Sequence, residues 1–341
     1  MLAFATFQAS ISQPTELTTP TRRAAPLAKV ALRCAPLMPR SRAILAMAAA
    51  EGPARAQILL KAEQMNRREI LLQGLVLQEH LANRDVGATT ATLDRILRVH
   101  PAHEADFFPI LVNALADFDG VDELAEVLDG SAPWHQRFLD HAVNQPNALL
   151  GLAALYPKIE NTTERFDIIL VGSLARAGSL DEAWSVYRRA HSSRREQPID
   201  HTARRWNQQM PPFDWRYADS TGIRVQPSIS LMDLQISILP GYGGILAQRT
   251  FHSNGKSLSL QVSHNIAPSS QLRNFRVSAE CAQNGDLLIN ETLEARTINW
   301  NLPSRAKECR FIVLKITGRV FSFESPVHGE ISVFDIKPVS I

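Results

Sequence analysis

The sequence changes character at one short stretch, Met210–Arg216, which reads MPPFDWR. Before it, apolar residues recur with the spacing of amphipathic helices. After it, short alternating segments are separated by Gly, Pro, Ser and Asn. Two adjacent prolines cannot continue a helix, because each lacks an N–H group and each disfavours the α conformation in the residue before it. A chain of 341 residues has room for about two domains, so we expect a helical domain and a strand domain that meet near this stretch.

The first part of the chain predicts a series of helices of about a dozen residues each, joined by short turns. Many such helices in succession are typical of an α-solenoid rather than a compact bundle. The expected helices are Met38–Ala50, Ala54–Asn66, Arg68–Leu81, Val86–Val99, Glu104–Asp117, Asp122–Leu128, Trp134–Val143, Asn147–Tyr156, Arg165–Ala177 and Leu180–Ser192.

The last of these helix pairs has the spacing of a tetratricopeptide repeat. Gly178 permits a tight turn between the two helices, and Ala183 is small where they approach each other. Tyr187 and Ala190 fall on one face of the second helix, one turn apart. Val171 departs from the pattern, which has a small residue at this position. The repeat-packing residues are Leu170, Leu174, Gly178, Ala183, Tyr187 and Ala190.

The part after the boundary predicts an antiparallel β-sandwich of the jelly-roll type, because roughly eight short strands follow one another without helical periodicity. The dipeptide Asn284-Gly285 is a strong hairpin signal. The expected strands are Leu231–Ile238, Ile245–Phe251, Ser257–Ser263, Asn274–Cys281, Leu287–Leu293, Thr297–Leu302, Cys309–Thr317 and Glu330–Ile336.

Charge is spread unevenly along the chain. The net charge is only +2, which argues against a dedicated nucleic-acid binder. Through residue 50 there are six basic residues and one acid, so this segment carries +5 and the remainder −3. We interpret residues 1–34 as a disordered tail; the alternative is a targeting or membrane-surface segment. No apolar run approaches the ~18 residues of a membrane span, so no transmembrane segment is expected.

Two of the three cysteines, Cys281 and Cys309, lie in the strand-rich part, and the third, Cys34, lies far away. Cys281 ends one expected strand and Cys309 begins another, so the two can meet at one end of neighbouring or facing strands. We expect a disulfide between them, which persists in an oxidising compartment such as the periplasm. The alternative is two buried thiols in a cytoplasmic protein.

No motif in the sequence indicates catalysis. A phosphate loop, HExxH and GxSxG are all absent from it, and Gly241–Gly244 leads into a strand rather than a helix. His100 and His103 have no third ligand nearby in the sequence, so we interpret them as surface residues. We therefore expect no catalytic residue, no metal and no cofactor.

Tryptophans and carboxylates are the remaining candidates for chemistry. Trp300, between Asn299 and Asn301, is the best candidate for a platform on which a sugar ring stacks. We interpret Trp206, Phe213 and Trp215 as interdomain anchors. A pair among Glu280, Asp286 and Glu291 would suit a glycosidase, which is the minority interpretation.

Several short features occur in a distinctive order along the chain. They are Asn66–Glu69, Leu93–Arg98, Phe107–Leu111, Ala132–Trp134 with Phe138, Pro212–Arg216, Leu239–Tyr242, and the pair Cys281 and Cys309. With these features, the chain from about residue 37 resembles an uncharacterised group of bacterial tetratricopeptide-repeat proteins of the sphingomonad type. Its last strand, Gly329–Ile336, is typical of the β-sandwich of carbohydrate-binding modules with a galactose-binding-like fold, to which the C-terminal half is similar. The resemblance implies a cell-envelope protein, sometimes near polysaccharide functions.

Together these observations predict four segments and a binding function. We expect a tail (1–34), a tetratricopeptide-like domain (35–200), a linker (201–216) and a β-sandwich (217–341). The expected function is a non-enzymatic scaffold whose repeats bind a protein partner and whose sandwich binds a glycan or a second protein. The alternative is a carbohydrate-active enzyme of the β-sandwich type. We favour the periplasm or cell envelope over the cytoplasm.

Overall fold

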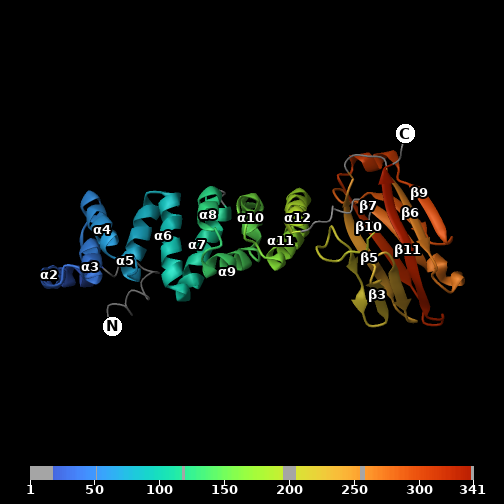
Figure 1. Ribbon diagram of the computed structural model, residues 1–341, viewed down its shortest axis with the longest axis horizontal. Helices are drawn as coiled ribbons and strands as arrows, with labels where there is room; N and C mark the ends of the chain where they lie inside the picture. Colours follow the sequence, from blue (N-terminus) through green and yellow to red (C-terminus); the bar gives the residue numbers. More distant parts are fainter. Residues whose placement is uncertain (1–17, 51, 117–119, 195–204, 254–257, 339–341) are drawn as a thin grey trace. The chain divides into compact units, whose positions relative to one another are not determined.

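The computed structural model describes all residues except 1–17, 51, 117–119, 195–204, 254–257 and 339–341. It divides into two compact units, Met1–Thr162 and Thr163–Ile341. The first is helical and the second contains antiparallel sheets, so the chain has an α+β fold in two parts (Figure 1). None of the described helices is long and apolar enough to cross a membrane.

The first unit is a succession of short helices whose apolar stripes meet. Side chains set several helix starts: the Asp85 carboxylate accepts a hydrogen bond from the backbone N–H of Ala88 at 3.0 Å, which satisfies one free donor of the first turn. Gly151 is needed because a Cβ there would lie 2.1 Å from the backbone oxygen of Leu115. The α-helices are α2 (Thr18–Cys34), α3 (Pro39–Ala48), α4 (Pro53–Met65), α5 (Ile70–Ala82), α6 (Val86–Val99), α7 (Glu104–Ala116), α8 (Val121–Val127), α9 (Pro133–Ala142) and α10 (Leu149–Leu155).

The prediction of a disordered tail over residues 1–34 is wrong for its second half, because Thr18–Cys34 forms α2, which packs on α3. Thr21 and Ala28 are buried there. The helix buries small side chains, and a search for large apolar residues does not detect such a face. Alanine also has the highest helix propensity, and α2 is rich in it. Residues 1–17 lie outside the described part.

The second unit begins with the helix pair α11 (Glu164–Arg176) and α12 (Leu180–Arg194). Gly178 makes the turn between them with φ +85°, a backbone conformation that favours glycine. Of the predicted repeat-packing residues, the five that carry side chains are buried: Leu170, Leu174, Ala183, Tyr187 and Ala190.

Two antiparallel sheets follow. Sheet A has the order β1-β5-β10-β7-β8 and sheet B the order β2-β3-β4-β11-β6-β9. One hydrophobic core contains residues of both sheets, because alternate side chains of each strand point inward. The strands are β1 (Arg216–Tyr217), β2 (Asp219–Ser220), β3 (Ile223–Pro227), β4 (Leu234–Ile238), β5 (Gly243–His252), β6 (Leu258–His264), β7 (Phe275–Cys281), β8 (Leu287–Thr292), β9 (Thr297–Asn301), β10 (Phe311–Arg319) and β11 (Val327–Pro338).

Two of the predicted anchors, Trp206 and Trp215, belong to the core of the sheets. Both are fully buried, with ring centroids 4.6 Å apart, and both pack on Phe334 of β11. Phe213 lies elsewhere, between Tyr187 of α12 and Phe311 of β10, at 5.2 and 6.0 Å. The stretch around Met210–Arg216 is therefore fixed to the sheets and to the last helix.

Asp214 joins α12 to the sheet part by hydrogen bonds. Its carboxylate accepts from the Tyr187 hydroxyl and from the backbone N–H of Met210, each at 2.9 Å. Arg249 of β5 donates to the Phe213 carbonyl at 2.7 Å. The structure thus groups α11 and α12 with the sheets, whereas the sequence suggested a helical domain that ends at residue 200.

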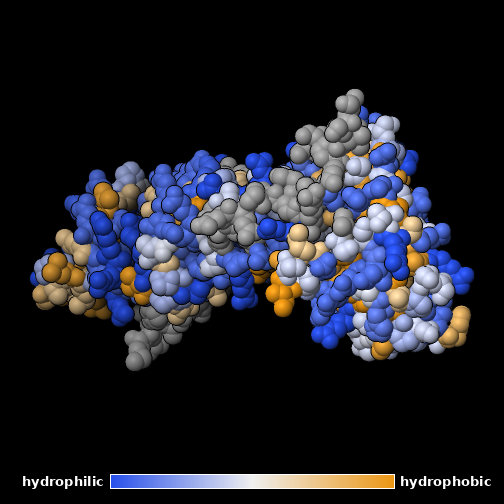
Figure 2. Space-filling view, turned by 45° about the vertical axis from the view of Figure 1, so that its right-hand side comes forward, coloured by the Kyte–Doolittle hydropathy of each residue, from blue (hydrophilic) through white to orange (hydrophobic). Residues whose placement is uncertain are grey.

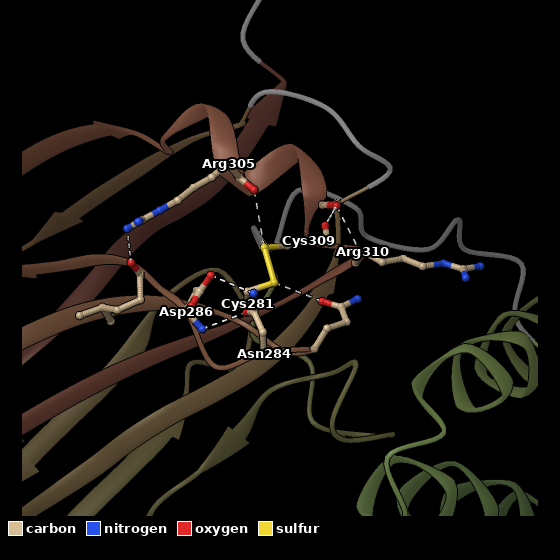
Figure 3. The surroundings of a disulfide bond; sticks show 9 residues. Cys281, Asn284, Asp286, Arg305, Cys309 and Arg310 are labelled. Carbon is tan, nitrogen blue, oxygen red and sulfur yellow. Dashed lines mark hydrogen bonds between the residues drawn. A yellow bond between two sulfur atoms is a disulfide. The ribbon is translucent and has the colours of Figure 1, made fainter.

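The structure contains a disulfide between Cys281 and Cys309, whose Cα atoms are 5.4 Å apart (Figure 3). Cys281 ends β7, and Cys309 lies just before β10. Both residues are buried. The turn beside the bond is held by the Cys281 N–H, which donates to the Asp286 carbonyl at 2.8 Å, and by Asn284, which donates to the Asp286 carboxylate. The disulfide therefore links the end of β7 to the segment just before β10 at one end of sheet A.

We predict that Tyr187→Phe weakens the second unit. A hydrogen bond to a carboxylate contributes about 1.5–3 kcal/mol, and its loss leaves one oxygen of the buried Asp214 without this donor. Urea unfolding should show a fall of that size in the free energy of unfolding. Tyr242→Phe is the matched control, because Tyr242 is 40% exposed and should lose little. Equal effects of the two changes would contradict the role given to Asp214.

We also predict that reduction of Cys281–Cys309 destabilises the fold. The cysteines are 28 residues apart in sequence, and closing such a loop stabilises a fold by about 3–4 kcal/mol on the chain-entropy model. Thermal unfolding with and without a thiol reductant measures the effect, and both samples carry the change Cys34→Ser. An unchanged transition on full reduction, verified by thiol counting, would contradict the prediction.

Candidate functional site

The structure does not bring the predicted sugar platform together. Trp300 is the strand partner of Leu260 of β6, whose side chain is in the core. The Trp300 side chain is half-buried and packs against that core. Asn299 and Asn301 pair with Gln261 and Ser259 and therefore point to the other side of β9. The tryptophan and the two asparagines lie on opposite faces of one strand, so they cannot hold one ligand.

The carboxylates that would have formed a glycosidase pair also separate. Glu280 of β7 forms an ion pair with Lys315 of β10 at 2.5 Å. Glu291 is the strand partner of Val277, whose side chain faces the core. Glu291 is therefore on the core side of the sheet, opposite to the side of Glu280. Asp286 belongs to the turn at the disulfide. Glu280 and Asp286 are thus each engaged by a local partner, Lys315 and Asn284, and Glu291 lies on the opposite side of the sheet from Glu280.

A different surface collects polar groups: the outer face of sheet B over β3, β4 and β11. Each of these strands alternates, with one side in the core and the other exposed or half-exposed. The inward residues are aliphatic, as in Ile223 and Val225 of β3. The outward residues are Arg224, Gln226, Gln235, Ser237, His328 and Glu330.

Strand register arranges these side chains in two rows. Ser237 pairs with Arg224 on one side and with His328 on the other. Gln235 likewise pairs with Gln226 and with Glu330. Directly opposed residues of antiparallel strands have Cβ atoms about 4.5–5.5 Å apart, so each row is a continuous line of polar groups across three strands.

A directional chain of hydrogen bonds begins at Arg224 in the first row and continues through the second row, Gln226, Gln235 and Glu330. Arg224 Nε donates to Gln226 Oε1 at 3.1 Å, Gln226 Nε2 donates to Gln235 Oε1 at 3.1 Å, and Gln235 Nε2 donates to Glu330 Oε1 at 3.4 Å. The chain runs from a cation to an anion, so each bond polarises the next. Each amide uses one donor and one acceptor site, and one N–H and one lone pair remain on each for a ligand.

Two adjoining hollows lie over this face and share Arg224, Gln226 and Ser237. One has a volume of about 680 Å³ and extends over β2 and β3 to Asp219 and Leu239. The other has a volume of about 560 Å³ and extends over β11 to His328 and Glu330, with Asn265 on its wall. Asn265 is held in place because its side-chain oxygen accepts from the Glu330 N–H at 2.6 Å.

Two tyrosines border the larger hollow. Tyr217 lines it, and its hydroxyl has no hydrogen-bond partner among the described residues. Burial, and next the charge of Asp214, raise the pKa of Tyr217, so its hydroxyl is a donor at neutral pH. Tyr242 packs its half-exposed ring on Gly222, which also lines the hollow; a Cβ at that glycine would lie 2.3 Å from the ring.

The described residues contain no group of three or more His, Cys, Asp or Glu side chains that could hold a metal ion. His100 contacts the Arg68 carbonyl at 2.7 Å, and His103 contacts the Asp106 carboxylate at 3.0 Å. Each histidine therefore has its own local partner rather than a shared one.

Sequence reasoning missed the polar rows, although it contained their signal. In the expected strand Leu231–Ile238, the apolar residues Leu234, Ile236 and Ile238 alternate, so the residues between them define the other face. The strand β3, with the pattern Ile-Arg-Val-Gln-Pro, was not predicted. Which polar residues align depends on the pairing of β4 with β11, which brings Gln235 beside Glu330 although the two are 95 residues apart in sequence.

No family model and no curated protein matches the chain. Three solved structures give partial likenesses. The accessory secretory protein 1, 2 and 3 structure of Streptococcus pneumoniae is 12% identical, covering 35% of this chain and 87% of that one, with a TM-score of 0.25.

The glycosylation-associated Gap123 complex of Streptococcus agalactiae is 13% identical, covering 37% and 44%, with a TM-score of 0.26. An arabinose-bound GH51 α-L-arabinofuranosidase is 14% identical, covering 41% and 26%, with a TM-score of 0.28. The chain thus spans less than half the length of the second and third structures. At these TM-scores the likenesses support no inference about ligand or activity.

We predict that Gly222→Ala destabilises the wall of the larger hollow. Gly222 has φ +78°, and the new Cβ would meet the Tyr242 ring, so a cost of about 1–3 kcal/mol is expected. Thermal or urea unfolding measures it. Gly172→Ala is the control: a Cβ there meets nothing, and the residue lies inside α11, so this change should leave the protein as stable or slightly more stable.

Proposed function

We propose that the protein is a non-enzymatic scaffold whose two-sheet part binds a glycan on the outer face of sheet B. The single observation that carries this is the chain Arg224–Gln226–Gln235–Glu330 beneath two adjoining hollows. Sugar hydroxyls both donate and accept hydrogen bonds, and side-chain amides offer both functions in a fixed plane. Fixed rows of such groups reduce the entropy lost on binding.

The charges on this face favour a neutral ligand. Arg224 and Glu330 are the two ends of the hydrogen-bonded chain, and Asp219 lines the same hollow as Arg224. A strongly anionic polymer would meet the two carboxylates, and a cationic one would meet the guanidinium. A neutral ligand rich in hydroxyl groups can hydrogen-bond both the guanidinium of Arg224 and the carboxylate of Glu330.

The helical part is proposed to bind a protein partner as an α-solenoid of tetratricopeptide-like repeats, and the sheet part to be a jelly roll of the galactose-binding type. Repeats stack so that each contacts its neighbours, which leaves extended side surfaces for partners. The disulfide Cys281–Cys309 supports an oxidising location such as the periplasm or cell envelope.

We predict that Gln235→Ala, in the intact chain, lowers affinity for the best ligand on an array of neutral glycans by about tenfold. The change removes the central member of the row, and a hydrogen bond to a neutral group contributes roughly 0.5–1.5 kcal/mol, with two lost here. Gln248→Ala is the matched control, because Gln248 lies on β5 of sheet A, opposite Lys315 in the strand register, and not on this face. Equal loss in both variants, or no glycan bound by the wild type, would refute the proposal.

Hydrolysis is tested on the same material. Release of reducing sugar from the bound glycan would show that the protein is a carbohydrate-active enzyme instead. If Glu330→Gln then abolished this release while glycan affinity remained, the Glu330 carboxylate would be the general acid or base of the hydrolysis. Binding without release is the expected outcome.

A further inference from the structure

The first helix carries a surface that the proposed function does not use. α2 buries one narrow side, with Thr21 and Ala28, whereas Leu27 is 74% exposed and Val30 56% exposed. With the exposed Cys34 these two residues occupy positions i, i+3 and i+7, so they form one stripe along the helix.

The stripe continues into the turn between α2 and α3, where Leu37 is 75% exposed and Met38 42% exposed. Hydrophobic colour is visible over the first two helices in the space-filling view (Figure 2). Single exposed leucines are ordinary on protein surfaces, but contiguous large apolar residues mark an interaction surface.

Cations accompany this apolar stripe: Arg23 lies in line with it, one turn before Leu27, and Lys29 and Arg33 lie on one side of it. Arg23, Lys29 and Arg33 of α2 are exposed, and none of them has a carboxylate partner among the described residues. The sequence contains no acid between Glu16 and Glu51. A helix with an apolar stripe beside unpaired basic residues has the composition of helices that lie in the interface of anionic membranes.

A second copy of the chain fits this stripe less well than an anionic membrane does. In a two-fold dimer the same patch meets itself, so the arginines and lysines of one copy would face those of the other. Anionic lipid headgroups supply the opposite charge, and the acyl region beneath them takes the apolar side chains. None of the described helices can span a bilayer, so the contact would be with its surface.

We propose that α2 and the turn after it bind the surface of an anionic lipid bilayer, with Leu27, Val30 and Leu37 inserted below the headgroups. Lys29 and Arg33 contact the lipid phosphates, and their aliphatic stems cover apolar surface beside the stripe. This inference is independent of the glycan site, which lies on the other unit.

The test is sedimentation of the intact chain with vesicles of phosphatidylcholine alone and of phosphatidylcholine with phosphatidylglycerol. We expect binding to the anionic vesicles only, weakened when NaCl is raised from about 50 mM to about 500 mM. Leu27→Gln with Val30→Gln should reduce binding by about tenfold or more. Lys29→Gln should reduce it by about fivefold.

Matched controls come from exposed residues outside the patch. Leu150, on α10, is 45% exposed, so Leu150→Gln should bind as the wild type does. Lys307→Gln is the control for charge, because Lys307 is exposed in the other unit. Circular dichroism and the thermal transition verify that each variant is folded, as expected for changes at exposed sites.

Several outcomes would overturn the proposal. The wild type could fail to sediment with anionic vesicles, or sediment equally with both kinds. The double variant could bind as the wild type does. Light scattering could show a wild-type dimer that the double variant dissociates, in which case the stripe joins two copies of the chain.

Discussion

The carboxylate of Asp214 is the contact on which the arrangement of the second unit depends. It is buried, and it accepts hydrogen bonds from the Tyr187 hydroxyl on one side and from the Met210 N–H on the other. A buried carboxylate without partners would cost several kcal/mol, so the segment and the helix must both stay in place. Phe213, next to it, packs on Tyr187 and Phe311 and seals the contact from water.

This contact gives the last helix pair a role beyond helix packing. Tyr187 of α12 is buried, and its ring and hydroxyl contact Phe213 and Asp214 in the chain segment that enters the sheets. Trp184, one turn away on the same helix, stacks on His252 of β5 with centroids 5.2 Å apart. Aromatic side chains serve well here because they bury large areas with few rotatable bonds.

The two surfaces with proposed roles rely on different forces. On sheet B, uncharged amides between one cation and one anion can hydrogen-bond a hydroxyl-rich ligand, and such contacts depend little on salt. On α2, unpaired cations beside exposed leucine and valine side chains suit a charged, amphipathic surface, and attraction to it falls as salt rises. Salt dependence therefore separates the two kinds of binding in one protein.

Local physics in the sequence determined most elements. Apolar residues that recur about every 3.6 residues located the helices from α3 to α12, and alternation of apolar and polar residues located the eight strands from β4 to β11. This works because the direction of each side chain follows from the period of its own backbone. One proline pair, Pro211-Pro212, marked the change from helix to strand. The helix α2 was missed because it buries small residues. The strands β1, β2 and β3 were also missed: β1 and β2 have two residues each, and β3 ends in a proline.

The site was decided by tertiary structure. Trp300 looked like a platform between two asparagines, but pairing with Leu260 turned it toward the core and the asparagines away. Gln226, Gln235 and Glu330 carry no motif, and they align only because β11 pairs with β4 across a long sequence separation. The sequence by itself thus determined which segments are helices and strands, since that depends on near neighbours. Only the fold decided which polar side chains meet, since strand order and register depend on contacts between distant residues.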